Sequence, residues 1–207
     1  MPLRDQIETL LCGRPERHAL FHSFSGGLRF KLSEGETKID QFLSALEKAG
    51  RICGDIFDTR HPPILWVRGW TRASGFEHRN SILEALHAGL RIPETREIWF
   101  EPVLDGNWDE NCPNAHWLNI AFPLPMDRIR NALWCAVANG TGVKPQIGCD
   151  IYLTSPERGV VVHPYDDRGM DIVGPNVELL RRLYHRHHDH LLDCDRAVMR
   201  RSFGEPE

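Results

Sequence analysis

The stretch Tyr165-Asp166-Asp167-Arg168-Gly169-Met170-Asp171-Ile172 decides the fold, because it combines turn chemistry with strand-forming flanks. Three consecutive valines at residues 160–162 precede it, and β-branched side chains favour a pleated strand. Aspartate side chains bind nearby backbone groups and glycine adopts turn conformations at little cost, so residues 166–169 predict a tight turn. Residues 170–173 resume the strand, and Gly174-Pro175-Asn176 ends it. The stretch therefore predicts an antiparallel hairpin.

The residues after this hairpin predict a closing helix. Apolar side chains recur there at steps of three and four residues, as in an amphipathic helix: Leu180, Leu183, Tyr184, His187 and Leu191. If the helix continues through Leu191-Leu192-Asp193-Cys194-Asp195-Arg196, then Asp193 and Arg196 share a face. The signature unit of strand, turn, strand and helix spans about residues 149–203.

Two hypotheses account for the charged residues of this unit. Buried carboxylates need partners, so Arg168 or Arg196 could pair with the aspartates between hairpin and helix. The structural motif would then contain Asp166, Asp167, Arg168, Gly169, Asp171, Asp193, Asp195 and Arg196. The alternative is a carboxylate site for metal or acid–base chemistry, which requires the side chains of Asp166, Asp167, Asp193 and Asp195 to converge.

Together with Leu28-Arg29-Phe30-Lys31-Leu32, these motifs resemble an uncharacterised bacterial domain-of-unknown-function family, family 3885. Members of that family end in a Y-D-D-R-G-x-D hairpin and a W-L-L-D-Y-D-R helix. This chain has His190 where the family usually has Trp, and Cys194 where it has Tyr. The resemblance implies a shared fold and carries no established activity.

Composition excludes several classes of protein. The net charge of −4 argues against an extended nucleic-acid surface, which needs clustered Lys and Arg. No segment has the apolar core of a secretory signal or the length of a membrane span. The six cysteines are scattered without a C-x-x-C pair, which favours reduced thiols. We therefore expect a cytoplasmic protein with neither a nucleic-acid nor a membrane partner.

The remaining segments alternate between strand and helix patterns. A helix is expected after Thr37, with an apolar side formed by Ile39, Phe42, Leu43, Leu46 and Ala49. Ser74 and Glu77 form the pattern of a capping box for the next helix. Strands are expected at 28–32, 64–67, 97–103, 116–122 and 149–154, and a helix at 126–138. Two strand–helix units suggest some α/β character in the front half. We expect one compact α+β domain over residues 1–207, with a mainly antiparallel sheet and flanking helices.

Histidines are concentrated in His185-Arg186-His187-His188-Asp189-His190. This string resembles the H-x-H-x-D-H motif of metallo-β-lactamase-like hydrolases. That motif lies in a loop after a strand and needs further ligands downstream, whereas this one lies on a predicted helix near the end of the sequence. On a helix, His187 shares a face with His190 and His185 with His188, a spacing that could bind zinc. We expect no metal and no other cofactor.

The predicted hairpin at residues 97–122 is acidic and aromatic. Its strand pattern places Glu97, Trp99 and Glu101 on a wet face. One reading is a solvated edge with core-facing tryptophans; the other is a docking surface for a basic protein. The candidate partner-binding residues are Glu97, Trp99, Glu101, Asp105, Trp108, Asp109 and Glu110.

No G-x-S-x-G elbow or other nucleophile context is present, so we identify no catalytic residue. The sequence favours a non-enzymatic bacterial protein-binding domain, with an immunity protein that occludes a basic toxin as the specific hypothesis. The alternative is a small metal-dependent or acid–base hydrolase that uses the C-terminal Asp and His residues.

Overall fold

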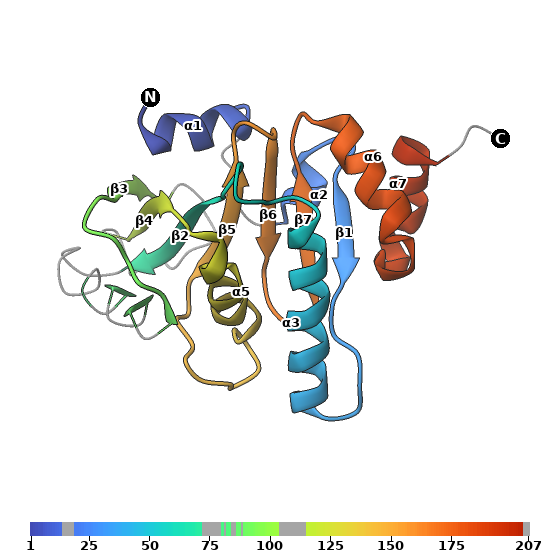
Figure 1. The fold of residues 1–207 in the computed structure, drawn as a ribbon, viewed down its shortest axis with the longest axis horizontal. Coiled ribbons are helices and arrows are strands. Elements are labelled where there is room, and N and C mark those ends of the chain that lie inside the picture. Colours follow the sequence, from blue (N-terminus) through green and yellow to red (C-terminus); the bar gives the residue numbers. More distant parts are fainter. Residues whose placement is uncertain are drawn as a thin grey trace.

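The computed structural model describes residues 1–13, 19–71, 80, 82–83, 86–87, 89–103 and 115–204. Its strands form one seven-stranded antiparallel sheet in the order β1-β7-β6-β5-β2-β4-β3 (Figure 1). The strands are β1 (Leu28–Lys31), β2 (Ile64–Thr71), β3 (Glu97–Pro102), β4 (His116–Pro123), β5 (Asp150–Ser155), β6 (Val160–Pro164) and β7 (Gly169–Val173). The expected α+β class is confirmed. The suggested α/β character of the front half was wrong, because β2 pairs antiparallel with both of its neighbours.

Helices cover both faces of this sheet (Figure 1). The helices are α1 (Leu3–Leu10), α2 (Leu20–Ser23), α3 (Lys38–Gly54), α5 (Ile129–Val137), α6 (Val177–Arg186) and α7 (Arg196–Phe203). Three short 3-10 turns are η1 (Met126–Arg128), η2 (His188–His190) and η3 (Asp193–Asp195). Strand alternation divides the core in two: Leu65 and Val67 of β2 join the cluster under α3, α5, α6 and α7, whereas Ile64 and Trp66 join the cluster under α1 and α2.

Helix α3 begins where its cap predicts. The Thr37 hydroxyl accepts a hydrogen bond from the Asp40 N–H, and the Asp40 carboxylate accepts one from the Thr37 N–H, so the capping box is complete. The predicted apolar side is only partly right, because the core-facing stripe is Phe42, Ala45, Leu46, Ala49, Ile52 and Cys53. Ile39 and Leu43 lie on the flank of this stripe and are 66% and 53% exposed. Ser74 and Glu77 lie outside the described residues.

The predicted C-terminal helix ends earlier than expected. Helix α6 ends at Arg186, and Leu191 has extended backbone angles. Leu191 forms a β-bridge with Phe30, and the Leu192 N–H donates to the Arg29 carbonyl over 2.9 Å. The condition of a helix that continues to residue 196 is therefore not met, because the chain leaves the helix to cover the outer edge of β1. No helix among the described residues is long and apolar enough to cross a bilayer.

Candidate functional site

Strands β3 and β4 form the expected hairpin, and β3 is the last strand of the sheet. Trp99 is only 7% exposed and belongs to the core cluster that contains Ile7 and Leu10 of α1. Phe100 points to the other side of the strand and is 45% exposed. Helix α1 covers the Trp99 face, so the reading with a core-facing tryptophan is confirmed for Trp99 and the reading of this face as wet was wrong.

The two described carboxylates of this hairpin bind groups within the domain. Glu97 Oε2 accepts the backbone N–H groups of Leu3 at 2.6 Å and Arg4 at 3.2 Å, so it caps the first turn of α1. Glu101 Oε1 accepts the Trp99 Nε1–H at 3.0 Å, and its other oxygen lies 3.8 Å from Arg68 Nε. Glu97 and Glu101 are therefore not the unpaired surface carboxylates that the docking hypothesis requires. Asp105, Trp108, Asp109 and Glu110 lie outside the described residues.

A second site is built around Arg29 of β1, which stands opposite Asp171 of β7 in the strand register. Arg29 Nε donates to Asp171 Oδ1 at 2.8 Å, and Arg29 Nη2 donates to Asp171 Oδ2 at 3.0 Å. The Phe21 N–H is a third donor to the same carboxylate, at 3.0 Å. Asp171 is fully buried, so these three bonds replace its hydration. The hydrogen bonds from Arg29 to Asp171 and the charge of that carboxylate raise the pKa of Arg29 above its ordinary value, and the guanidinium remains protonated.

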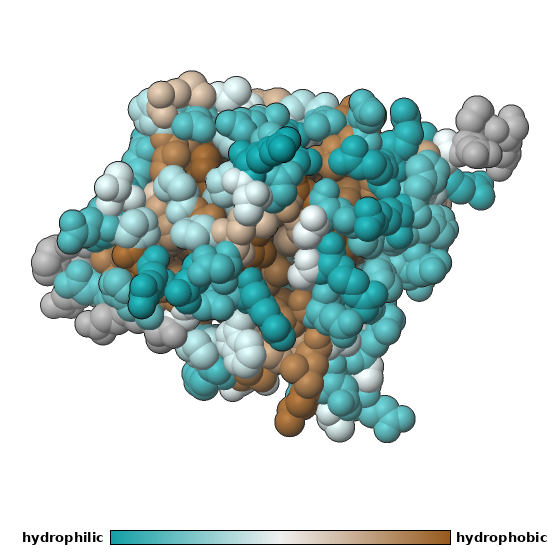
Figure 2. Space-filling view, in the orientation of Figure 1, coloured by the Kyte–Doolittle hydropathy of each residue, from teal (hydrophilic) through white to brown (hydrophobic). Residues whose placement is uncertain are grey.

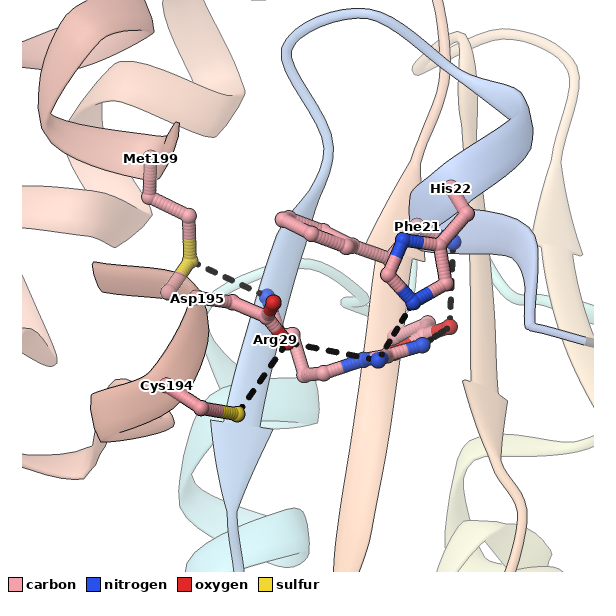
Figure 3. Close-up of polar contacts among 7 residues, drawn as sticks. Phe21, His22, Arg29, Cys194, Asp195 and Met199 are labelled. Carbon is pink, nitrogen blue, oxygen red and sulfur yellow. Dashed lines mark hydrogen bonds and ion pairs between the residues drawn. The ribbon is translucent and has the colours of Figure 1, made fainter. Parts of the chain in front are cut away.

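The same arginine reaches the C-terminal segment (Figure 3). Arg29 Nη1 lies 3.3 Å from Asp195 Oδ2 and 3.1 Å from His22 Nε2. The Cys194 thiol lies 3.6 Å from the Asp195 carboxylate, and the Arg29 N–H donates to Met199 Sδ at 3.3 Å. Arg29 thus joins α2, β7 and η3, which are far apart in the sequence. We call Arg29, Asp171 and Asp195 the Arg29 cluster.

Arg168 and Arg196 do pair with aspartates of the motif, but each pair is local and neither connects the hairpin to the helix as expected. Arg168 forms a two-point ion pair with Asp166 of its own turn, with Nε and Nη2 at 2.9 and 2.6 Å from Asp166 Oδ2. Arg196 binds Asp193, three residues before it, at 3.0 Å. Short spacing makes these local pairs possible without ordering a long loop. Both pairs are largely solvated, with the Arg168 side chain 79% and the Asp193 side chain 85% exposed.

Gly169 has a steric role in the signature hairpin. A Cβ added at this position would lie 2.0 Å from the Tyr165 hydroxyl and 2.9 Å from the Phe30 carbonyl oxygen. Tyr165 therefore packs directly over a residue that must lack a side chain. Asp167 of the same turn is 7% exposed. Burial raises the pKa of Tyr165 to about 12, so its phenol stays protonated at neutral pH.

A cavity of about 450 Å³ lies beside the Arg29 cluster, and Asp150, His163, Tyr165 and Arg168 are among its lining residues. His163 stands opposite Asp171 in the register and stacks on Tyr152, with ring centroids 4.2 Å apart. The Tyr165 phenol and the Arg29 guanidinium are both held in their protonated forms, so they act as hydrogen-bond donors. Such groups can contact an acceptor, but neither is prepared to act as a nucleophile or general base.

Three of the four carboxylates proposed for metal or acid–base chemistry have separate partners. Asp166 is bound in its own turn, Asp193 pairs with Arg196, and Asp195 pairs with Arg29. The described residues contain no group of three His, Cys, Asp or Glu side chains placed to hold a metal ion. The geometry therefore assigns these three carboxylates to ion pairs, and the fourth, Asp167, is nearly buried in its turn.

The histidine string is divided by the end of α6. His187 Nε2 lies 2.8 Å from Asp55 Oδ2, and Arg186 Nε lies 3.0 Å from the same oxygen. His187 and His190 stack with ring centroids 6.4 Å apart, across a 3-10 turn and not along a helix face as expected. Burial and the nearby Lys48 lower the pKa of His190. His187 thus anchors the end of α6 to the end of α3.

Arg29 is the residue of this site that the sequence did not reveal as functional. Alternation in Leu28-Arg29-Phe30-Lys31-Leu32 places Arg29 on the face opposite Leu28 and Phe30, which is the available signal. The sequence did not show which strand would pair with the strand of Arg29, because Asp171 lies 142 residues away in the sequence.

The fold and this site define a class of protein: an antiparallel α+β domain in which a buried arginine–carboxylate cluster joins distant segments of the chain. The chain belongs to the family described as Domain of unknown function (DUF3885), whose model matches residues 3–195. The expected membership of that family is therefore confirmed. Comparison with curated proteins and with solved structures gives no match.

Proposed function

We propose that this domain is a non-enzymatic protein-binding domain and that its partner adds an extended segment to strand β3. The supporting observation is the position of β3 at the end of the sheet, where β4 is its single strand neighbour within the described residues. In an antiparallel edge strand, alternate residues direct their N–H and C=O groups away from the sheet. Those groups can bind the main chain of another protein.

The edge is held rigid by the contacts of its inner face. Trp99 is buried under α1, Glu97 caps α1, and Glu101 binds the Trp99 indole. A partner therefore meets a strand that needs little ordering, which favours affinity. The exposed Phe100 ring supplies an apolar contact on the outer side. Pro102 lacks an N–H and limits the pairing to the preceding residues.

The opposite edge of the sheet is less suited to a partner. Strand β1 is covered by the bridge between Phe30 and Leu191 and by the hydrogen bond from Leu192 to Arg29. A natural sheet commonly protects one edge in this way. The contrast between the covered β1 edge and the β3 edge supports β3 as the site of recognition.

The finer proposal is that the partner is a basic toxin and that the chain is a cytoplasmic immunity protein. A net charge of −4 and the carboxylates of Asp105, Asp109 and Glu110, which follow β3 in the sequence, support a basic partner. Opposite charge steers association, and a protein that mimics phosphate charge can block a nuclease. A hydrolase remains the alternative function, but the ion pairs of Asp166, Asp193 and Asp195 leave it with less support.

The experiment starts by capturing a partner on the tagged chain from its own organism and identifying it by mass spectrometry. The purified partner is then titrated into wild-type chain and into Phe100→Arg by calorimetry. Val198→Arg is the matched control, because both side chains are 45% exposed and Val198 lies on α7. We expect one-to-one binding that weakens about tenfold or more in Phe100→Arg and is unchanged in the control. Equal affinity of the two variants would overturn the proposal.

A further inference from the structure

An exposed apolar strip runs along α3. Figure 2 shows hydrophobic residues reaching the surface over the lower half of this helix. Ile39 and Leu43, one helical turn apart, are 66% and 53% exposed. Scattered apolar side chains are ordinary on a protein surface, but these two lie on one face of one helix and continue into a groove.

The groove lies between α3 and α5 and has a volume of about 540 Å³. Leu43 and Leu46 form one wall, and Met126, Ile129 and Leu133 form the other. Gly50 and Gly54 also line it, and a Cβ added at either glycine would meet no atom within 4 Å. A glycine in the interior of a helix costs about 1 kcal/mol relative to alanine, and neither a positive φ nor a close neighbour requires glycine at position 50. Gly54 is the last residue of α3 and extends the same open surface by one turn.

The bulky and the open positions of α3 are related by symmetry. The point between Leu46 and Glu47 is the midpoint of two pairs along the helix. One pair is Leu43 with Gly50, and the other is Ile39 with Gly54. A twofold axis through that centre, with the two helices antiparallel, places each leucine over the other copy's Gly50 and each isoleucine over its Gly54. We propose that a second copy of this chain docks along α3 through this self-complementary surface.

Glu47 of each copy lies beside the proposed axis, and Arg130 lines the same groove. The charges at the rim and the length of α3 suit a second copy. In the antiparallel arrangement Arg51 of one copy stands at the level of Phe42 of the other, within one turn of that copy's Asp40. Arg51 already pairs with Glu47 at 2.8 Å and is 61% exposed, so its guanidinium faces solvent at this rim. Helix α3 has 17 residues and is about 26 Å long. Two such helices, each with its α5, would form a four-helix face, and a stable interface requires it to bury roughly 800 Å² per partner.

The test is the mass of the full chain in solution, measured by light scattering and sedimentation equilibrium up to about 100 μM. Leu43→Glu places a charge in the interface. Gly50→Leu fills the hollow and replaces glycine with a better helix former, so the fold of the single chain is not weakened. Val198→Glu is the control, because Val198 is exposed on α7, away from the groove.

We expect a wild-type dimer, an unchanged dimer in Val198→Glu, and a dissociation constant raised at least about tenfold in Leu43→Glu and Gly50→Leu. Gly50→Leu must keep the wild-type circular dichroism spectrum. A monomeric wild type, or a dimer that Gly50→Leu leaves intact, would overturn the proposal. Because β3 takes no part in this surface, Phe100→Arg should leave the dimer unchanged, and the two proposals can fail separately.

Discussion

Replacing Arg29 by methionine should destabilise the domain more than any surface substitution. Asp171 is 0% exposed and has three hydrogen-bond donors, two from Arg29 and one from the Phe21 backbone. The Arg29→Met variant keeps the volume of the aliphatic part of the arginine side chain. It removes both guanidinium donors, so of these three donors the buried Asp171 carboxylate keeps only the Phe21 N–H. Breaking a buried pair in this way costs about 3–5 kcal/mol. Domains of this size are stable by only about 5–15 kcal/mol, so the loss is a large fraction of the total.

Urea unfolding followed by tryptophan fluorescence and far-UV circular dichroism measures this free energy. The Arg29→Met, Asp171→Leu double variant should recover much of the loss, because replacing both buried partners by apolar groups is often close to neutral. Asp193→Ala is the control: its side chain is 85% exposed, so losing its bond to Arg196 should cost less than about 1 kcal/mol. A loss below about 1 kcal/mol in Arg29→Met, or simple additivity in the double variant, would refute the reasoning.

Three further outcomes follow from the structure. Gly169→Ala should lose about 1–3 kcal/mol in urea unfolding, because its new methyl group overlaps the Tyr165 hydroxyl; an unchanged midpoint would contradict this packing. In a Cys112→Ser background at pH 8, a thiol reagent should label the exposed pair first: Cys12 and Cys194. Burial raises the pKa of the other described thiols and shields them, so they should react only on unfolding: Cys53, Cys135 and Cys149. Burial and Lys48 lower the pKa of His190 in the folded state below 6.5. As the pH falls, His190 is therefore protonated in the unfolded chain before it is protonated in the folded chain. The free energy of unfolding should fall as the pH drops from about 6.5 through the folded-state pKa. His190→Gln should therefore show a smaller loss of urea midpoint between pH 7.5 and 5.5 than wild type, and an equal loss would contradict the shift.

Features set by local chemistry could be predicted from the sequence. The helix that begins after the Thr37 cap, the hairpin at β6 and β7 and the hairpin at β3 and β4 are present as expected. Each depends on residues close together in the chain, where propensity and turn chemistry dominate. The antiparallel sheet follows from the same hairpins.

Features set by long-range packing could not be predicted. The end of α6 at Arg186 depends on Leu191 bridging to Phe30, and the partner of Asp171 depends on β1 lying beside β7. The alternation of residues around Trp99 correctly predicted a strand, but it did not predict which face of that strand α1 covers. The acidic hairpin shows the same limit, because Glu97 accepts a hydrogen bond from the Leu3 N–H at the start of α1, 94 residues away in the sequence.

Hydrogen exchange of the chain with and without its purified partner tests the central proposal most directly. The account predicts slower exchange of β3 amides in the complex, within residues 98–101, with little change at β1 and around the Arg29 cluster. Protection confined to the Arg29 cluster and its neighbouring cavity, with β3 unchanged, would contradict it.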